Sequence, residues 1–231
     1  KGAGLEDGTL TLDDLDDAAI AKAREKYAER HQQEGWGSEI PGWNTQKLLD
    51  KVGLTIHGHI TRACLLLLGR AERATALLSP NPAEITWKVA AERVAEHFHP
   101  PFLLTTTEVG QRIRNPNIKL FPANELLAVT LPRYDTKVIL EGLHNCLSHQ
   151  DYAQGGRIVV EESAGLVRMI NQGGFFDGQP DEYASGTRTP ERYRNERLAK
   201  AMAEVGMIDK AGFGIHDMVQ TQRRRFLPLP D

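Results

Sequence analysis

The sequence predicts a mixed α/β protein, because helical and strand-like patterns alternate along its 231 residues. In the stretch 136–149, apolar residues recur at helical spacing. Residues 157–161 and 166–170 alternate as two antiparallel strands across a short turn that contains glycine. A further helical pattern follows at 196–205. Helices and strands in this order pack as helices against a sheet.

Composition sets the limits for function. Hydrophobic residues make up 40% of the chain, which is enough for a proper core. The net charge is −3 and the pI is near 6.3, so a nucleic-acid contact would need a local basic patch. The longest apolar run, Ala63 to Leu68, is too short to span a membrane, and no signal peptide is evident. The chain starts at Lys1, so we expect it to be part of a longer protein.

Two cysteines, Cys64 and Cys146, lie in apolar surroundings. Buried free thiols in a reducing cytoplasm are the favoured interpretation, and a disulfide between them is the alternative. The sequence therefore predicts a cytoplasmic protein without a membrane partner.

The N-terminal part reads as a small helical connector, which we place at 1–80. An acidic start and basic later turns predict a helix over 11–31. A short helix over 46–51 and a tight hairpin over 56–60 follow. The stretch 61–68 is a buried helix or strand that ends at a glycine. Helix, hairpin and apolar segment together resemble a winged-helix-like unit.

Four histidines form two His-x-His pairs: His57 with His59, and His97 with His99. No cysteine or carboxylate lies near them at the spacing of zinc ligands. Surface and core histidines are the favoured interpretation, so no zinc is expected.

The middle of the chain contains a strand at 84–89 and a helix predicted over 106–114, followed by a connection that contains prolines. Arg112, Arg114 and Lys119 form a modest basic cluster. A solvated helix face and a nucleic-acid contact both explain this cluster.

The predicted helix 136–149 carries a polar face. Glu141 and Asn145 are four residues apart, and His149 extends the face by one turn. A carboxylate can orient or deprotonate a water, and an asparagine oxygen can bind Mg²⁺. Two glycine-bearing segments follow, Asn171-Gln-Gly173-Gly174 and Gly212-Phe-Gly214. The amides of the second could cradle a phosphate at the start of a helix. This order is compatible with a nucleotide site.

The last third contains a polar stretch, 177–192, which we interpret as a flap. Arg194-Asn195 then starts the helix 196–205. The final helix, from Ile215, ends in Arg223-Arg-Arg225. These arginines either stabilise a helix C-terminus or contact phosphates.

Four blocks occur in a specific order and spacing: Glu141-x3-Asn145-x3-His149-Gln-Asp151-Tyr152, Asn171-x-Gly173, Tyr193-Arg194-Asn195, and Met207-Ile-Asp-x3-Gly212-x-Gly214. On these blocks, residues 135–231 resemble a bacterial family of predicted transcriptional regulators. Its members are also labelled RecG-related ATP-dependent DNA helicases, or divergent-AAA proteins, and usually carry a Schlafen-like domain. The resemblance implies a GHKL-like fold for residues 81–231, in which helices cover one mixed sheet.

The resemblance also implies roles for individual residues. Glu141 would activate water and Asn145 would bind Mg²⁺ beside ATP. Asn171 falls near the position that reads the adenine amino group, with the pair Gly173-Gly174 in the adjoining turn. Gly212 and Gly214 would stand in the phosphate-binding turn. The long glycine-rich lid of active GHKL ATPases is not apparent, and the chain has no helicase motif.

Three functions follow from this resemblance. The first is a nucleotide-binding regulatory module of a DNA-binding transcriptional regulator. It would reach DNA through flanking domains, so we expect weak or no DNA binding by this stretch alone. The second is a scaffold for dimerisation or domain coupling without nucleotide, and a homodimer is compatible with the apolar tail 226–229. The third is a Mg²⁺-dependent ATPase. On the scaffold hypothesis, Glu141, Asn145 and His149 form a structural hydrogen-bond network around Asp151-Tyr152. We also assign a structural polar role to these residues: His149, Asp151, Tyr152, Arg194 and Asn195.

Overall fold

The computed structural model describes most of the chain, namely residues 10–78, 83–121, 127–174, 178–179, 181–182, 185, 187–188, 193–208, 214–225 and 227. Its helices and strands form a mixed α/β fold, which confirms the predicted class.

The central sheet has four strands in the order β4-β3-β7-β8. They span Val94–Phe98 (β4), Ile85–Val89 (β3), Ile158–Ser163 (β7) and Leu166–Ile170 (β8). The inner pair, β3 and β7, is parallel, and the two outer pairs are antiparallel. The mixed sheet was expected, but β4 was not. The largely exposed edge strand β4 has a weak apolar pattern, Val-Ala-Glu-His-Phe, that does not predict a strand.

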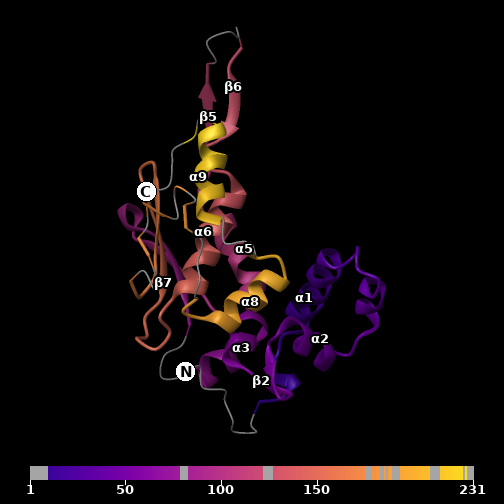
Figure 1. Ribbon diagram of the computed structural model, residues 1–231. Helices are drawn as coiled ribbons and strands as arrows, with labels where there is room; N and C mark the ends of the chain where they lie inside the picture. The colour runs from indigo at the N-terminus through magenta and orange to yellow at the C-terminus, as the bar shows by residue number, and fades with distance from the viewer. Residues whose placement is uncertain are drawn as a thin grey trace.

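Helix α6 (Thr136–His149) packs against β8, and helices α5 (Phe102–Arg112) and α8 (Glu196–Glu204) pack against α6 (Figure 1). Leu143 and Leu147 of α6 are fully buried, as are Ile85 and Val160 of the sheet. A Cβ atom at Gly142 would lie 3.2 Å from Sδ of Met169. The glycine therefore lets α6 approach β8 closely.

A buried carboxylate ties the end of α5 to the sheet. Glu162 on β7 is only 6% exposed, and its Oε1 accepts a hydrogen bond from Trp87 Nε1 at 2.5 Å. The backbone N–H of Arg114 donates to the same carboxylate at 3.1 Å. These two bonds satisfy a carboxylate that would be costly to bury alone.

The N-terminal part folds from short helices and one hairpin, with these elements: η1 (Leu12–Asp14), α1 (Asp17–Arg30), η2 (Gly37–Gly42), α2 (Thr45–Val52), β1 (Thr55–Ile56), β2 (His59–Ile60), α3 (Arg62–Leu68) and α4 (Ala71–Leu77). The predicted hairpin is confirmed, and its turn residues His57 and Gly58 have the positive φ angles typical of two-residue hairpins. The stretch after it is a helix. The long first helix begins at Asp17 rather than Thr11, because the Asp16 side chain accepts a bond from Ala19 N.

The predicted start of α5 was wrong. The helix begins at Phe102 because Pro101 is its N-cap, and the carbonyl oxygen of Pro101 accepts the first helical bond from Thr105 N at 3.1 Å. Thr106 lies inside the helix, where its hydroxyl donates to the carbonyl oxygen of Phe102 at 2.8 Å. A threonine in a sequence can thus indicate a cap that the backbone does not form.

A separate two-stranded arm was also not predicted. Strands β5 (Asn117–Leu120) and β6 (Val129–Pro132) pair only with each other within the described residues, and they project away from the sheet (Figure 1). Pro116 and Pro122 predict a plain connection here, because proline is disfavoured within strands.

Both cysteines are buried free thiols, and burial raises the pKa of Cys146 to about 12. None of the described helices is long and apolar enough to cross a membrane. Over the same residues, no three His, Cys, Asp or Glu side chains gather as metal ligands.

Candidate nucleotide site on helix α6

Helix α6 presents the predicted polar face. Its first turn is capped by Asp135, whose side chain accepts a hydrogen bond from Lys137 N at 2.8 Å. One side of the helix is buried in the core. Glu141, Asn145 and His149 lie on another side, and each is partly exposed. The spacing of four residues therefore gives the shared face that the sequence predicts.

Glu141 lies in a cleft between α6 and α9 (Gly214–Arg224). The volume of the cleft is about 430 Å³, within the range of roughly 300–1,000 Å³ usual for small-molecule sites. The residues that line it are Lys137, Val138, Glu141, His216, Asp217, Met218, Gln220, Thr221 and Arg224. The lining thus combines two carboxylates with basic groups and a short apolar wall.

Asp135 holds α9 in place at the first turn of α6. Its carboxylate forms an ion pair with Arg225, and its N–H donates to Oε1 of Gln222 at 3.5 Å. Gln222 is 1% exposed, so its amide is part of the packed interface. The end of α9 is thereby fixed next to the start of α6.

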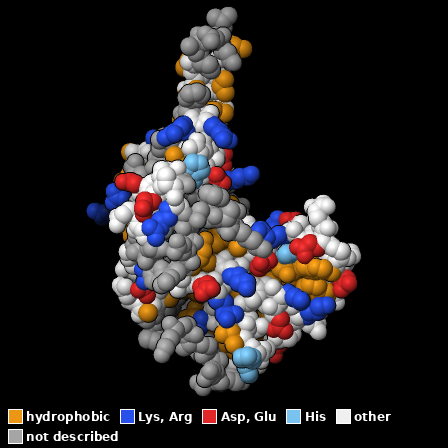
Figure 2. All heavy atoms as spheres, in the orientation of Figure 1, with side chains coloured by type: hydrophobic (Ala, Val, Ile, Leu, Met, Phe, Trp, Pro, Cys, Tyr) orange, Lys and Arg blue, Asp and Glu red, His pale blue; other side chains and the backbone are white. Residues whose placement is uncertain are grey.

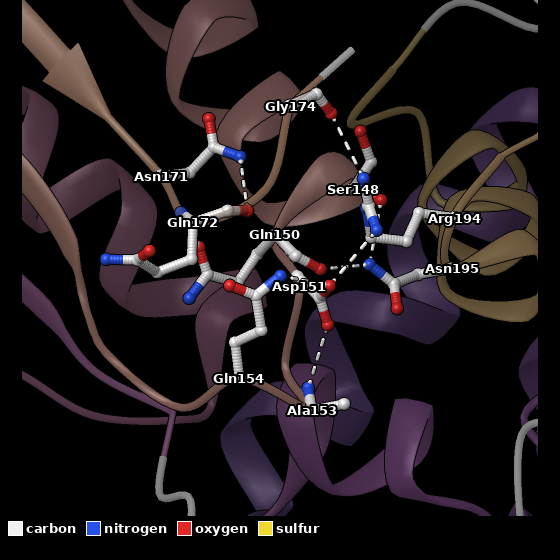
Figure 3. Close-up of polar contacts among 10 residues, drawn as sticks. All are labelled: Ser148, Gln150, Asp151, Ala153, Gln154, Asn171, Gln172, Gly174, Arg194 and Asn195. Carbon is white, nitrogen blue, oxygen red and sulfur yellow. Dashed lines mark hydrogen bonds and ion pairs between the residues drawn. The ribbon is translucent and has the colours of Figure 1, made fainter. Parts of the chain in front are cut away.

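A polar junction lies at the other end of α6 (Figure 3). Nη1 of Arg194 is 3.1 Å from Oδ2 of Asp151, and its Nη2 donates to the carbonyl oxygen of Gly174 at 3.0 Å. Gly173 has a φ of +98°, and a Cβ atom there would lie 3.2 Å from Cζ of Arg194. The predicted glycine turn is therefore packed against an arginine of the chain itself.

Asn195 ties α8 to the C-terminus of α6 in this junction (Figure 3). Its Nδ2 donates to the carbonyl oxygens of Ser148 at 3.0 Å and Gln150 at 2.7 Å. These carbonyls stand at the end of the helix, where the backbone lacks partners. Asn195 thus caps a helix other than its own.

His149 and Tyr152 complete the junction. The His149 ring stacks on Tyr193 with a centroid distance of 5.8 Å. Burial, together with the charge of Arg194, lowers the pKa of His149. The Tyr152 hydroxyl donates to the carbonyl oxygen of Leu147 at 3.0 Å, and burial raises the pKa of that hydroxyl. All five residues predicted to form a polar network therefore lie around the end of α6.

Asn171 lies beside this junction, and its Nδ2 donates to the carbonyl oxygen of Gln172 at 3.2 Å (Figure 3). Asn145 lies one turn beyond Glu141 and is not part of the cleft lining. Gly214 is the first residue of α9, and Gly212 lies outside the described residues. The structure thus places Glu141 in the cleft and the Asn171–Gly174 segment at the junction, with Asn145 on the helix between them.

Two buried side chains of this region were missed from sequence. Gln150 is 1% exposed; its Oε1 accepts from Gln172 N at 2.7 Å and its Nε2 donates to the carbonyl oxygen of Gly156. His144 is also buried, on the side of α6 opposite to solvent. In the helical pattern of α6, His144 lies on the same side as the apolar core positions. That position could have predicted its burial from the sequence.

Two family descriptions match separate parts of the chain. Residues 155–231 match the family described as "Putative ATP-dependent DNA helicase recG C-terminal". Residues 8–81 match a domain of unknown function, DUF8451. No curated protein is similar enough in sequence to match.

One solved structure has a similar fold over almost the whole chain. It is the DIP2311 protein from Corynebacterium diphtheriae, with a TM-score of 0.68 and 20% sequence identity. The alignment covers 96% of this chain but only 43% of the other, so this chain spans less than half the length of that protein. At this identity the likeness concerns the fold alone.

The C-terminal third of the chain is therefore similar to an ATPase-like module of RecG-related proteins. The matching range begins after α6. The roles of Glu141 and Asn145 consequently depend on the geometry of α6 and on the sequence blocks, not on this match.

Proposed function

We propose that this chain is a nucleotide-binding regulatory module of a DNA-binding transcriptional regulator. The observation that carries the proposal is the position of Glu141, which faces a cleft of about 430 Å³ beside the ATPase-like segment. A binding module needs this cleft and a few polar groups, whereas hydrolysis also needs an attacking water held in line with the terminal phosphate.

The residues of this region fit ATP and Mg²⁺. Mg²⁺ prefers oxygen ligands and is usually held by one or two protein oxygens plus phosphates and water. Asn145 has a partly exposed side chain that makes no hydrogen bond within the described residues, so its Oδ1 is available to the ion. The bound ion would neutralise phosphate charge, while Glu141 would orient a water on the same helix face.

Calorimetric titration of ATP and of ADP, each with Mg²⁺, tests the proposal. We expect binding by the unaltered chain and a loss of at least tenfold in affinity for Asn145→Ala. Asn117→Ala is the matched control, because Asn117 is an exposed asparagine on the separate arm. No heat and no shift of the melting temperature with either nucleotide would rule out the nucleotide site.

A scaffold without nucleotide is the second candidate, and one observation favours it. Arg194 and Asp151 pack against Gly173, so the turn expected to approach a ligand already has neighbours in the protein. On this reading the junction couples α6 to α8, and the chain joins flanking domains or a second copy. The calorimetric experiment separates the two candidates, because a scaffold predicts no nucleotide binding.

A further inference from the structure

Within the described residues, the arm formed by β5 and β6 forms its hydrogen bonds to the body at its base. Asn115, before β5, closes this base through two bonds with the backbone of Tyr134, after β6, with distances of 2.7 and 2.8 Å. The Tyr134 hydroxyl in turn donates to the carbonyl oxygen of Gly165, between β7 and β8, at 3.1 Å. Beyond this point, the two strands bond only with each other within the described residues. An isolated two-stranded hairpin is marginally stable in water, so a partner would stabilise the arm.

The outer part of the arm exposes large apolar side chains. Phe121 is 76% exposed and Leu127 is 79% exposed, which are the two highest values among the exposed large hydrophobic residues of the described chain. Val129 is 37% exposed on the same arm. Single exposed apolar residues are common, but a cluster of them on a projecting element indicates a contact surface.

Basic side chains gather where the arm joins the body (Figure 2). We call five of them the basic collar: Lys119 on β5, Arg133 after β6, Lys137 on α6, and Arg223 and Arg224 at the end of α9. None of the five forms an ion pair with another described residue. The position of α9 beside the arm base follows from the Arg225–Asp135 ion pair, three residues after β6.

Other arginines near the base are already neutralised. Arg112 pairs with Glu96 and Arg114 with Glu92. Lys137 and Arg224 share the α6–α9 cleft with the carboxylates of Glu141 and Asp217. The five positive charges of the basic collar outnumber these two, so a local positive excess remains in a chain whose net charge is −3. Such a local excess attracts a polyanion, although the chain as a whole would not.

We propose that the arm and its basic collar bind duplex DNA, with the collar on the phosphates and the apolar tip in a groove. Apolar side chains of β-ribbon proteins insert between base steps while basic residues hold the backbone. An anionic membrane offers similar chemistry, but the similarity of the C-terminal third to a DNA helicase family favours DNA. The proposal rests on the proposed role in a DNA-binding regulator and adds a contact made by this chain itself.

The salt dependence of DNA binding is the first test, made without nucleotide so that it stands apart from the calorimetry. We would titrate a labelled 30-base-pair duplex with the whole chain and follow fluorescence anisotropy. Five phosphate contacts predict a loss of affinity of roughly 500-fold between 50 and 200 mM salt, and three contacts about 40-fold. The double variant Lys119→Ala/Arg223→Ala should show the smaller loss and weaker binding at 50 mM.

The matched control is Lys51→Ala/Arg62→Ala, which removes two exposed basic side chains from α2 and α3 and gives the same net charge. The control should bind as the unaltered chain does. Equal weakening by both variants would overturn the proposal, because binding would then follow net charge rather than the collar. Absence of binding at 50 mM salt would also overturn it.

The apolar tip needs its own variant, Phe121→Ser/Leu127→Ser. Both side chains are exposed, so folding should be unaffected, and an unchanged melting temperature checks this. We expect at least fivefold weaker DNA binding and an unchanged salt slope. Binding of the same proteins to vesicles with and without anionic phospholipid tests the membrane alternative. Binding to anionic vesicles, lost in the tip variant, without binding to DNA would replace DNA by a membrane surface and overturn the proposal.

Discussion

Nδ1 of His144 lies 2.7 Å from the carbonyl oxygen of Met207, so a buried imidazole joins α6 to the segment after α8. Its Nε2 lies 3.3 Å from the hydroxyl oxygen of Thr106 on α5. Helices α5 and α6 and the segment after α8 therefore meet at one titratable side chain. Burial disfavours the charged imidazolium and lowers the pKa of His144 to about 4.

This pKa predicts a pH-dependent stability. The unfolded chain binds the proton with a pKa of about 6.5. The stability that neutral His144 contributes to the folded state is therefore fully present above that pH and is lost as the pH falls toward 4. This loss lowers the free energy of unfolding by about 3 kcal/mol. Urea unfolding at pH 7 and at pH 4.5 measures it. His144→Gln should be less stable at pH 7 and should show a weaker pH dependence, whereas His59→Gln, at an exposed position, should behave as the unaltered chain.

The two glycines at the end of β8 should differ in their tolerance of a side chain. Gly173→Ala places a Cβ 3.2 Å from Arg194 and Asp151 at a φ of +98°, so we expect a loss of about 1–3 kcal/mol in unfolding free energy. Gly174→Ala has no neighbour within 4 Å and is the control. Equal effects of the two substitutions in urea denaturation would argue against close packing at Gly173.

Asn195→Asp tests the cap on α6. The substitution keeps the shape of the side chain but replaces an amide donor by a carboxylate that faces two carbonyl oxygens. We expect destabilisation of about 2 kcal/mol, since two acceptors lose their donor and a charge is repelled. Asn117→Asp, on the exposed arm, should change the melting temperature little. A stability near that of the unaltered chain for Asn195→Asp would exclude the capping role.

Glu141→Gln separates binding from hydrolysis. If Glu141 orients water, the amide removes the base but keeps the size of the side chain, so Mg²⁺-dependent release of phosphate should fall by at least a factor of about 100. ATP affinity should stay within about threefold, because the proposal assigns Mg²⁺ to Asn145. Phosphate release and calorimetry on the same preparation measure both. Turnover that is unchanged in Glu141→Gln would remove the catalytic role.

The sequence predicted well those elements whose own pattern determines them. The strands β7 and β8, the helix α6 with its Asp135 cap and the hairpin around Gly58 follow from periodicity and turn residues. Strand β4 and the β5–β6 arm do not, because their strand structure depends on pairing with a neighbour rather than on an amphipathic pattern.

The polar junction shows the same limit for the site. The sequence blocks place Asp151 and Arg194 in one polar network, but they do not predict the packing of Arg194 against Gly173, which only the fold provides. Glu162 is a stronger example. A carboxylate next to Glu161 in a strand reads as solvent-exposed, but the indole of Trp87 and the backbone of Arg114 enclose it. Periodicity predicts which face of a strand or helix is buried, but not which hydrogen-bond donors of other elements lie against that face.

The parallel pair of β3 and β7 has a consequence for synthesis of the protein. Ile85 pairs with Ile158, and the whole stretch that forms α5, the arm and α6 is translated between them. Strands β3 and β4 therefore leave the ribosome with one edge open, and that edge stays unpaired until β7 emerges. Such long-range pairing slows folding and exposes intermediates to aggregation. A nascent chain that stalls before β7 would thus be a substrate for chaperones that shield open strand edges.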